Sequence, residues 1–107
     1  MPGVQAKPSA VTYGILIKAY GASNMLDESF DMFRDMLQAK LVPNAVTYGC
    51  LLDACVKNNK LERAIEVWDN MKYNSVRLNT ILYTTMIKAF SKAFQLEQAI
   101  DLYNQMM

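Results

Sequence analysis

Two consecutive stretches, AVTYGILIKAYGASNMLDESFDMFRDMLQAKLVPN (residues 10–44) and AVTYGCLLDACVKNNKLERAIEVWDNMKYNSVRLN (residues 45–79), align with each other without a gap. Both begin with Ala-Val-Thr-Tyr-Gly and both end with Asn, and a third stretch (residues 80–107) opens with Thr-Ile-Leu-Tyr-Thr at the same 35-residue offset. The positions that are identical in all three are Tyr13/Tyr48/Tyr83, Ala19/Ala54/Ala89, Leu26/Leu61/Leu96 and Met36/Met71/Met106. Self-similarity at a fixed period is the signature of a repeat architecture. We therefore predict three copies of one structural unit.

The repeat boundaries follow from this alignment. Repeat 1 is predicted over residues 10–44, repeat 2 over residues 45–79, and a truncated repeat 3 over residues 80–107. Residues 1–9 lie before the first complete copy. They are interpreted either as the tail of a preceding repeat or as a boundary at which a longer protein was cut.

Within each repeat, apolar residues recur at the spacing of two amphipathic helices. In the first helix the predicted buried positions are Tyr13, Leu16, Ile17 and Tyr20, then Tyr48, Leu51, Leu52 and Cys55, then Tyr83, Met86, Ile87 and Phe90. In the second helix they are Leu26, Phe30, Phe33 and Met36, then Leu61, Ile65, Trp68 and Met71, then Leu96, Ile100, Tyr103 and Met106. One such hairpin cannot bury both of its faces, and stacking makes the core continuous. The predicted fold is all-α, a right-handed α-solenoid of three helix–turn–helix repeats.

Composition and charge restrict the classes of function. The 107-residue chain has 11 basic and 10 acidic residues, a net charge of +1, and no histidine. Histidine is the commonest general base and metal ligand, and the sequence shows no glycine-rich phosphate loop, so we predict no enzyme activity, no cofactor and no metal site. No apolar run approaches the roughly 20 residues of a membrane span. The first residues do not have the pattern of a signal peptide either.

The two cysteines, Cys50 and Cys55, lie five residues apart in one apolar run. This spacing is neither that of a redox CxxC motif nor that of metal ligands. We predict two reduced, buried thiols in a reducing compartment.

The period and the pattern together resemble a known family. Ala45-Val46-Thr47-Tyr48, Leu51-Leu52-Asp53-Ala54, Leu61-Glu62-Arg63-Ala64 and Trp68-Asp69-Asn70-Met71 are similar to the 35-residue P-type repeat of the pentatricopeptide repeat (PPR) family. The resemblance covers residues 10–107, and residues 6–9 resemble the tail of a preceding repeat. The tetratricopeptide family is close, but it has a 34-residue period and prefers glycine where this chain has Ile17, Leu52 and Ile87. The resemblance implies single-stranded RNA as partner, and a role in organellar RNA metabolism in a mitochondrion or plastid.

The face of each first helix opposite the apolar stripe is the candidate RNA-binding surface. It carries Val11, Gly14, Lys18 and Ala22, then Val46, Gly49, Asp53 and Lys57, then Ile81, Thr84, Lys88 and Lys92. In a stack of repeats these positions are expected to line the inner, concave surface, where each repeat meets one base. The lysines Lys18, Lys57, Lys88 and Lys92 are expected to contact phosphates, and Asp53 is interpreted as a charge partner for a nearby lysine.

The resemblance assigns roles by position in the repeat. The second residue sandwiches a base, which implies Val11, Val46 and Ile81. The fifth and the last residues hydrogen-bond the base edge. The resulting pairs are Gly14 with Asn44, Gly49 with Asn79, and Thr84 with a residue beyond Met107.

Glycine departs from the family pattern at the fifth position, which is usually a small polar residue. Gly14 and Gly49 have no side chain to hydrogen-bond a base, so the first two repeats are expected to discriminate weakly. Glycine inside a helix also costs about 1 kcal/mol relative to alanine. Two interpretations remain open: close approach of a ligand or a neighbouring helix, and inherited repeat similarity without a role.

The asparagines and lysines also have structural interpretations. Asn44 and Asn79, like Ser9, come just before a predicted helix, where their side chains can cap free backbone N–H groups. Capping and base contact do not exclude each other, because an amide has both a donor and an acceptor end. Each lysine alone is equally well explained as a solvated surface residue, and only recurrence on one face favours phosphate binding.

Two function hypotheses follow. The first is single-stranded RNA binding by a fragment of a longer array, with one base per repeat and weak base discrimination. The alternative is a protein–protein interaction solenoid or scaffold, because helical repeats form good peptide grooves. We also predict self-association through exposed repeat ends, since the last helix, ending at Met107, has no following repeat to cover it.

Overall fold

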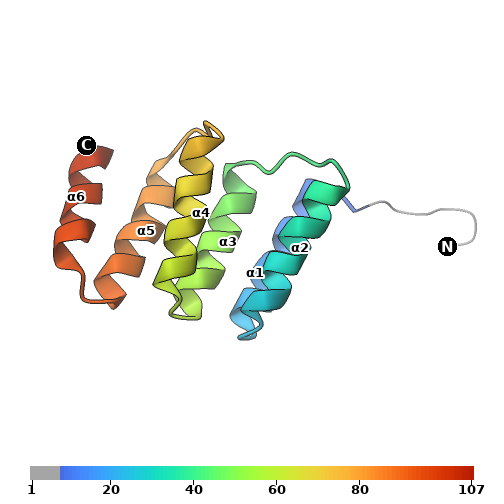
Figure 1. Ribbon diagram of the computed structural model, residues 1–107, viewed down its shortest axis with the longest axis horizontal. Coiled ribbons are helices and arrows are strands. Elements are labelled where there is room, and N and C mark those ends of the chain that lie inside the picture. The colour runs from blue at the N-terminus through green and yellow to red at the C-terminus, as the bar shows by residue number, and fades with distance from the viewer. Residues whose placement is uncertain (1–7) are drawn as a thin grey trace, which may run out of the picture.

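The computed structural model describes residues 8–107, so the interpretation of residues 1–7 as a repeat tail or boundary lies outside the described residues. Figure 1 shows an elongated row of helical hairpins, with the first hairpin at one end and the last at the other. The helices are α1 (Ala10–Ala22), α2 (Leu26–Gln38), α3 (Ala45–Lys57), α4 (Leu61–Tyr73), α5 (Thr80–Lys92) and α6 (Leu96–Met106). The first helices of the hairpins begin at residues 10, 45 and 80, one sequence period apart. None of the described helices is long and apolar enough to cross a membrane.

Side-chain caps fix where the first helix of each hairpin begins. Ser9 Oγ accepts a hydrogen bond from the Thr12 N–H at 3.3 Å, and the Thr12 hydroxyl accepts one from the Ser9 N–H. Asn44 and Asn79 occupy the equivalent positions before α3 and α5. Such caps stabilise a helix by about 1 kcal/mol each because they satisfy backbone donors that have no partner within the helix. The capping interpretation of the three residues is therefore confirmed.

The turn inside each hairpin has one residue in the left-handed conformation. These residues are Asn24, Asn59 and Phe94, with φ near +60°. The next N–H donates back to a carbonyl in the last helical turn at 2.9 Å in all three hairpins. This arrangement ends the helix and reverses the chain. Phe94 is an unusual residue in this conformation, and its side chain is almost fully exposed.

The helices form two layers. Helices α1, α3 and α5 pack side by side as one layer, and α2, α4 and α6 form the other, each packed on the first helix of its own hairpin. The second helix of one hairpin also contacts the first helix of the next. The predicted all-α repeat solenoid is confirmed.

The core lies along the middle of the row, where α3 is covered on both sides. The fully buried side chains include Ile17, Leu51, Leu52, Met71 and Met86. Aromatic pairs cross each boundary between hairpins at equivalent positions: Phe33 with Tyr48 at 5.5 Å between ring centroids, and Trp68 with Tyr83 at 5.3 Å.

The predicted burial of the apolar stripe is wrong at the two ends of the row. In α6, Leu96 is 67% exposed, Ile100 49% and Tyr103 50%, and in α1 Leu16 is also exposed. The α6 residues that pack on α5 are Ala99 and Leu102. The apolar stripe of α2 and of α4 is covered largely by the hairpin that follows each of them. The apolar stripe of α6 lacks such a cover in the structure and remains accessible to solvent.

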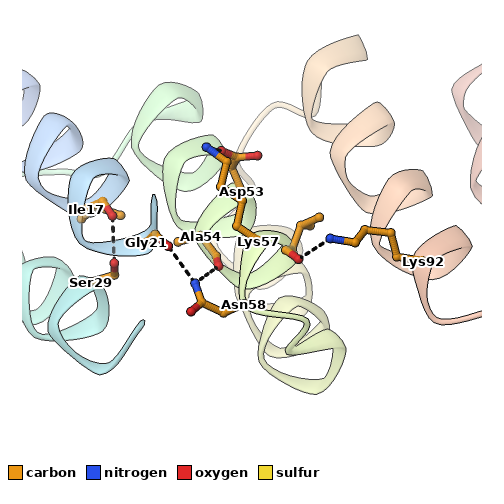
Figure 2. A network of polar contacts seen from close by, with 9 residues as sticks. Ile17, Gly21, Ser29, Asp53, Ala54, Lys57, Asn58 and Lys92 are labelled. Carbon is orange, nitrogen blue, oxygen red and sulfur yellow. Dashed lines mark hydrogen bonds and ion pairs between the residues drawn. The ribbon is translucent and has the colours of Figure 1, made fainter. Parts of the chain in front are cut away.

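Two junctions join the three hairpins, the first between α1 and α3 and the second between α3 and α5. At the first junction Asn58 Nδ2 donates to the carbonyls of Gly21 (2.9 Å) and Ala54 (2.7 Å). At the second, Lys92 Nζ donates to the Val56 carbonyl at 3.1 Å. Figure 2 shows these three bonds, together with the Ser29 hydroxyl, which donates to the Ile17 carbonyl inside the first hairpin. Gly21 and Val56 hold the same position in their repeats. At both junctions, therefore, a side chain donates a hydrogen bond to the equivalent carbonyl near the end of a first helix.

Candidate functional site

Two similar hollows lie on the layer of first helices, one at each junction. The first hollow, of about 310 Å³, is lined by Ala10, Val11, Gly14, Ile15, Lys18, Asn44, Val46, Thr47 and Cys50. The second hollow, of about 300 Å³, is lined by Lys18, Ala45, Val46, Gly49, Cys50, Asp53, Asn79, Ile81, Leu82 and Thr85. These volumes are at the lower end of the range for ligand sites, which suits a small group rather than a large ligand.

Exposed apolar side chains stand on both sides of each hollow. Val11 (71% exposed) and Val46 (72%) flank the first, and Val46 and Ile81 (72%) flank the second. They are second residues of consecutive repeats, so one period separates them. Branched apolar groups held apart in this way can contact both faces of a flat ligand.

An asparagine from the end of the preceding repeat lines each hollow. Asn44 Oδ1 accepts hydrogen bonds from the Thr47 N–H (3.0 Å) and hydroxyl (3.1 Å), and Asn79 Oδ1 accepts from the Leu82 N–H (2.9 Å). The oxygen end of each amide is therefore engaged in capping. The Nδ2 group is the part of each side chain that remains for a ligand, and it can only donate.

The two glycines of the candidate surface are not required by helix packing. A Cβ atom on Gly14 would lie 4.0 Å from Cys50 Sγ, and one on Gly49 would lie 3.6 Å from Leu82 Cδ2. Both are ordinary van der Waals distances. The first interpretation of these glycines was close approach of either a ligand or a neighbouring helix, and the helix part of it is therefore excluded. Close approach of a ligand and inherited repeat similarity are the explanations left.

The four candidate lysines have different surroundings. Lys18 lines both hollows. Lys57 is paired with Asp53 at 3.1 Å, as predicted for that acid, and Lys92 is bonded to the Val56 carbonyl (Figure 2). Lys88 is exposed and lines neither hollow. The structure thus brings only Lys18 next to the apolar and amide groups, and Lys57 and Lys92 already have protein partners.

Thr84 also lies outside the two hollows. Its side chain is exposed, and the second hollow is lined instead by its neighbour Thr85, whose hydroxyl donates to the Ile81 carbonyl at 2.8 Å. Thr84 holds the repeat position of Gly14 and Gly49, which line the first and the second hollow, and its predicted partner lies beyond Met107.

Cys50 was missed as a site residue, although it lines both hollows. It is only partly buried, so the prediction of two buried thiols holds for Cys55 and is wrong for Cys50. Burial raises the pKa of the Cys50 thiol, and the charge of Lys18 opposes this rise. Burial raises the pKa of Cys55 to about 12. The available signal for Cys50 was its spacing, because it follows Gly49 directly and lies four residues after Val46, on the same side of the helix.

Among residues 8–107, no group of three His, Cys, Asp or Glu side chains is arranged to hold a metal ion. The chemistry that both hollows offer is apolar contact from two sides, one amide donor and the ammonium group of Lys18; the second hollow is also lined by Asp53, whose carboxylate is paired with Lys57. This set suits binding of a flat, polar, anionic ligand.

Comparison with known families identifies the chain. A model of the PPR repeat family matches residues 8–57 and 43–92, and a PPR repeat model matches residues 81–107. The chain belongs to the PPR repeat family. The family predicted from the repeat pattern is thereby confirmed.

Solved structures of this PPR fold are similar over almost the whole chain. The crystal structure of the pentatricopeptide repeat protein PPR10 from maize superposes with a TM-score of 0.80 at 17% identity, covering 97% of this chain and 15% of PPR10. PPR10 in complex with an 18-nt psaJ RNA element gives a TM-score of 0.79 at 19% identity, covering 98% of this chain and 15% of PPR10. The present chain thus spans a small part of the length of that protein. No curated protein matches this chain in sequence.

Proposed function

We propose that this PPR chain binds single-stranded RNA along the layer of α1, α3 and α5, with one base in each hollow. The observation that carries the proposal is the repetition of one ligand-shaped arrangement at both junctions. Each hollow combines two exposed branched side chains, a free amide donor and a nearby glycine. The family and the RNA complex of PPR10 support the choice of RNA as ligand. One base per repeat is the register of PPR repeats in general.

The arrangement suggests how a base is held. Val11 and Val46 would contact the two faces of one base, and Val46 and Ile81 those of the next. The Nδ2 groups of Asn44 and Asn79 would donate to acceptors on the base edges. Lys18 lies beside both hollows, where its ammonium group would neutralise a backbone phosphate.

Base discrimination is expected to be weak. In each hollow the asparagine offers only donors, because its oxygen caps a helix. The glycine at the fifth position adds no hydrogen-bonding side chain. Every RNA base carries at least one acceptor on its Watson–Crick edge, so a lone donor excludes none of them, and the first two repeats should discriminate little among bases.

A matched pair of variants tests the site. Val46→Glu places a carboxylate between the two hollows, and Val42→Glu adds the same charge in the loop before α3, where Val42 is 82% exposed. Binding of a labelled pool of short single-stranded RNAs is measured by fluorescence polarisation at low salt. We expect Val46→Glu to weaken binding about tenfold or more and Val42→Glu to weaken it much less. Equal affinities of the two variants, or no binding by the unmodified chain, would refute the proposal.

The salt dependence tests the phosphate contact of Lys18. In Lys18→Gln the slope of log affinity against log salt should become shallower by about 0.7, the value for one phosphate contact with a single strand. Lys72→Gln is the matched control, because Lys72 is an exposed residue of α4 in the other layer. An unchanged slope in Lys18→Gln would remove Lys18 from the interface.

The organellar role is a separate part of the proposal. We propose that a longer protein containing this stretch acts in RNA metabolism of a mitochondrion or plastid, and the family alone supports this. Imaging the tagged full-length protein in its own cells tests it. A signal confined to the cytosol or nucleus would contradict it.

A second candidate function is binding of a protein partner on the other layer. A groove of about 460 Å³ lies between α2 and α4, with Phe33, Leu37 and Leu51 among its apolar residues and Arg34 and Glu66 among its charged ones. Its apolar lining favours a peptide segment, which RNA does not resemble. Retention of peptide binding in Val46→Glu would separate this function from RNA binding.

A further inference from the structure

The groove on the layer of second helices lies between α2 and α4, over α3. Its floor includes the buried side chains of Tyr48 and Leu51 from α3, and its walls include Phe33 and Leu37 from α2 and Val67 from α4. The rings of Phe33 and Tyr48 lie 5.5 Å apart between centroids. All lining residues belong to the first two hairpins, so the groove does not involve the surfaces at the two ends of the row.

Leu37 departs from the polar character of its position. It is 47% exposed although it lies at an internal junction, and the same position of the next repeat is Lys72, an exposed residue of α4. A single exposed leucine needs no explanation. This one stands beside Phe30 and Phe33 in one groove, and an accessible apolar surface of this kind marks an interaction site.

Polar groups mark the two ends of the groove. Near the starts of the helices, Arg63 Cζ of α4 lies 4.0 Å from the centroid of the Phe30 ring of α2. At the other end Asn74 Nδ2 donates to the Asn70 carbonyl at 2.9 Å, and both residues line the groove. From Phe30 to Leu37 helix α2 rises by about 10 Å, which is two helical turns. The apolar part of the groove therefore matches about two turns of a partner helix.

The helices on the two sides of the groove are acidic. Helix α2 has four acidic residues and one basic residue, and α4 has three acidic and two basic, so the pair carries a net charge of −4. Three of the seven acids lie in a first turn, where a negative charge interacts favourably with the helix dipole. The others, Asp31, Asp35, Glu66 and Asp69, lie further along the helices.

The layer of first helices has the opposite sign. Helices α1, α3 and α5 together carry four lysines and one acidic residue. An anionic ligand such as RNA is therefore attracted to the first layer and repelled by the second. The acidic sides of the groove favour a cationic ligand.

The two arginines at the groove do not reverse this sign. Arg34 forms an ion pair with Asp31 at 3.1 Å, and Arg63, which lies over the Phe30 ring, is 4.0 Å from Glu66. Among the ion pairs of residues 8–107, none includes Asp35 or Asp69. The acidic side chains thus outnumber the basic ones available to balance them.

We propose that the groove binds a basic amphipathic helix of a partner protein. Its apolar side chains enter the groove, and its lysine or arginine residues lie against the acidic sides of α2 and α4. This inference rests on the second candidate function, protein binding at this groove, and specifies the chemistry of the partner. Helices that bind in grooves use apolar anchors one turn apart. Phe33, Leu37 and Val67 supply the apolar surface that such anchors contact.

Two labelled peptides test the charge of the partner. Both carry leucines at helical spacing over about 14 residues, or four turns, with lysine at the polar positions of one peptide and glutamate at those of the other. Binding to the unmodified chain is measured by fluorescence polarisation at low salt and without RNA. We expect the Leu/Lys peptide to bind about tenfold more tightly than the Leu/Glu peptide. Added salt should reduce this preference, because it screens exposed charges.

A matched pair of variants locates the peptide on the molecule. Leu37→Lys introduces the residue that the next repeat has at this position, and Gln38→Lys adds the same charge at an exposed neighbour that does not line the groove. We expect Leu37→Lys to weaken binding of the Leu/Lys peptide about tenfold and Gln38→Lys to weaken it about twofold or less. Circular dichroism checks that both variants keep their helix content.

A second pair tests the acidic side of the groove. Glu66→Lys reverses a charge in the lining, and Asp69→Lys makes the same reversal on α4 outside the lining. The preference for the Leu/Lys over the Leu/Glu peptide should fall more in Glu66→Lys than in Asp69→Lys. Equal preferences in these two variants would contradict a cationic helix seated in the groove.

The remaining outcomes separate this inference from the functions on which it depends. If the Leu/Glu peptide binds as tightly as the Leu/Lys peptide, the inferred charge of the partner is wrong, although protein binding at the groove stands. If neither peptide binds, or if Leu37→Lys and Gln38→Lys bind equally, the second candidate function fails as well. Val46→Glu, on the layer of first helices, should bind the Leu/Lys peptide like the unmodified chain. A loss of peptide binding in Val46→Glu would place the peptide outside the groove.

Discussion

The first and the second junction are built from the same repeat positions, yet they pack differently. At the first, Gly21 lies so close to Ala54 that a Cβ atom on the glycine would be 2.4 Å from the Ala54 Cβ and 2.8 Å from its Cα. At the second, the equivalent residues are Val56 and Ala89, and a cavity of about 160 Å³ lies beside them. Helix α1 accordingly packs along α3 more closely than α3 packs along α5.

The difference shows that one repeat position controls how closely two hairpins approach. A glycine there allows backbone contact, whereas a valine holds the next helix away. The helix-end carbonyl is satisfied in both cases, by the short Asn58 side chain at the close junction and by the long Lys92 side chain at the open one (Figure 2). The two donors come from adjacent repeat positions, since the equivalent of Asn58 in the third repeat is Ala93 and that of Lys92 in the second is Lys57. The longer donor side chain is the one that spans the more open junction.

The largest expected effect comes from filling the close contact. Gly21→Ala should lower the free energy of unfolding by about 1–3 kcal/mol, because the added methyl group meets the backbone of Ala54 and cannot displace it cheaply. Gly49→Ala is the control, since its Cβ makes an ordinary contact and alanine favours a helix by up to about 1 kcal/mol. Urea denaturation measures both. If Gly21→Ala were as stable as Gly49→Ala, the close contact would not limit the first junction.

Removing the donor at the first junction should have the next largest effect. Asn58→Ala leaves the carbonyls of Gly21 and Ala54 without their side-chain donor at a packed interface. We expect a loss of about 1–2 kcal/mol in the free energy of unfolding. Asn74→Ala is a matched control, because Asn74 makes an equivalent bond to the Asn70 carbonyl on an exposed surface. Equal losses in the two variants would show that the bond across the junction adds nothing.

The smallest effect is expected at the second junction. Lys92→Met keeps most of the apolar chain but removes the ammonium donor to Val56. Because Lys92 is largely exposed and water can replace the donor, we expect a loss of about 0.5 kcal/mol or less in thermal or urea unfolding. A loss as large as that of Asn58→Ala would contradict the ranking of the two junctions.

Much of the fold could be predicted from the sequence because each repeat contains its own signals. The 35-residue offset, the apolar spacing and the capping residues Asn44 and Asn79 are local features, and they placed the helices and their order. The exposure of Ile100 could not be read from its repeat, because it depends on whether another hairpin follows. Burial in a solenoid is a property of neighbouring repeats rather than of one repeat.

The candidate site was predictable in part. Family resemblance named several of the residues that line the hollows, including Val46 and Asn79, but not Cys50 or Thr85. The bonds of Asn58 and Lys92 were not predictable, because each joins groups 36 or 37 residues apart through one particular side-chain conformation. The role of Gly21 was also missed. It differs from the residues at the same position of the other repeats, Val56 and Ser91, so repeat comparison alone gave it no weight.

The most direct test of the proposed function follows the asparagine side chains by NMR while a short single-stranded RNA is added. We predict shifts of the Nδ2 amide signals of Asn44 and Asn79, together with the backbone amides of Gly14 and Gly49. The side-chain amides of Asn70 and Asn74, in the groove between α2 and α4, should stay in place. Shifts at Asn70 and Asn74 without shifts at Asn44 and Asn79 would contradict the account and place the ligand on the other layer.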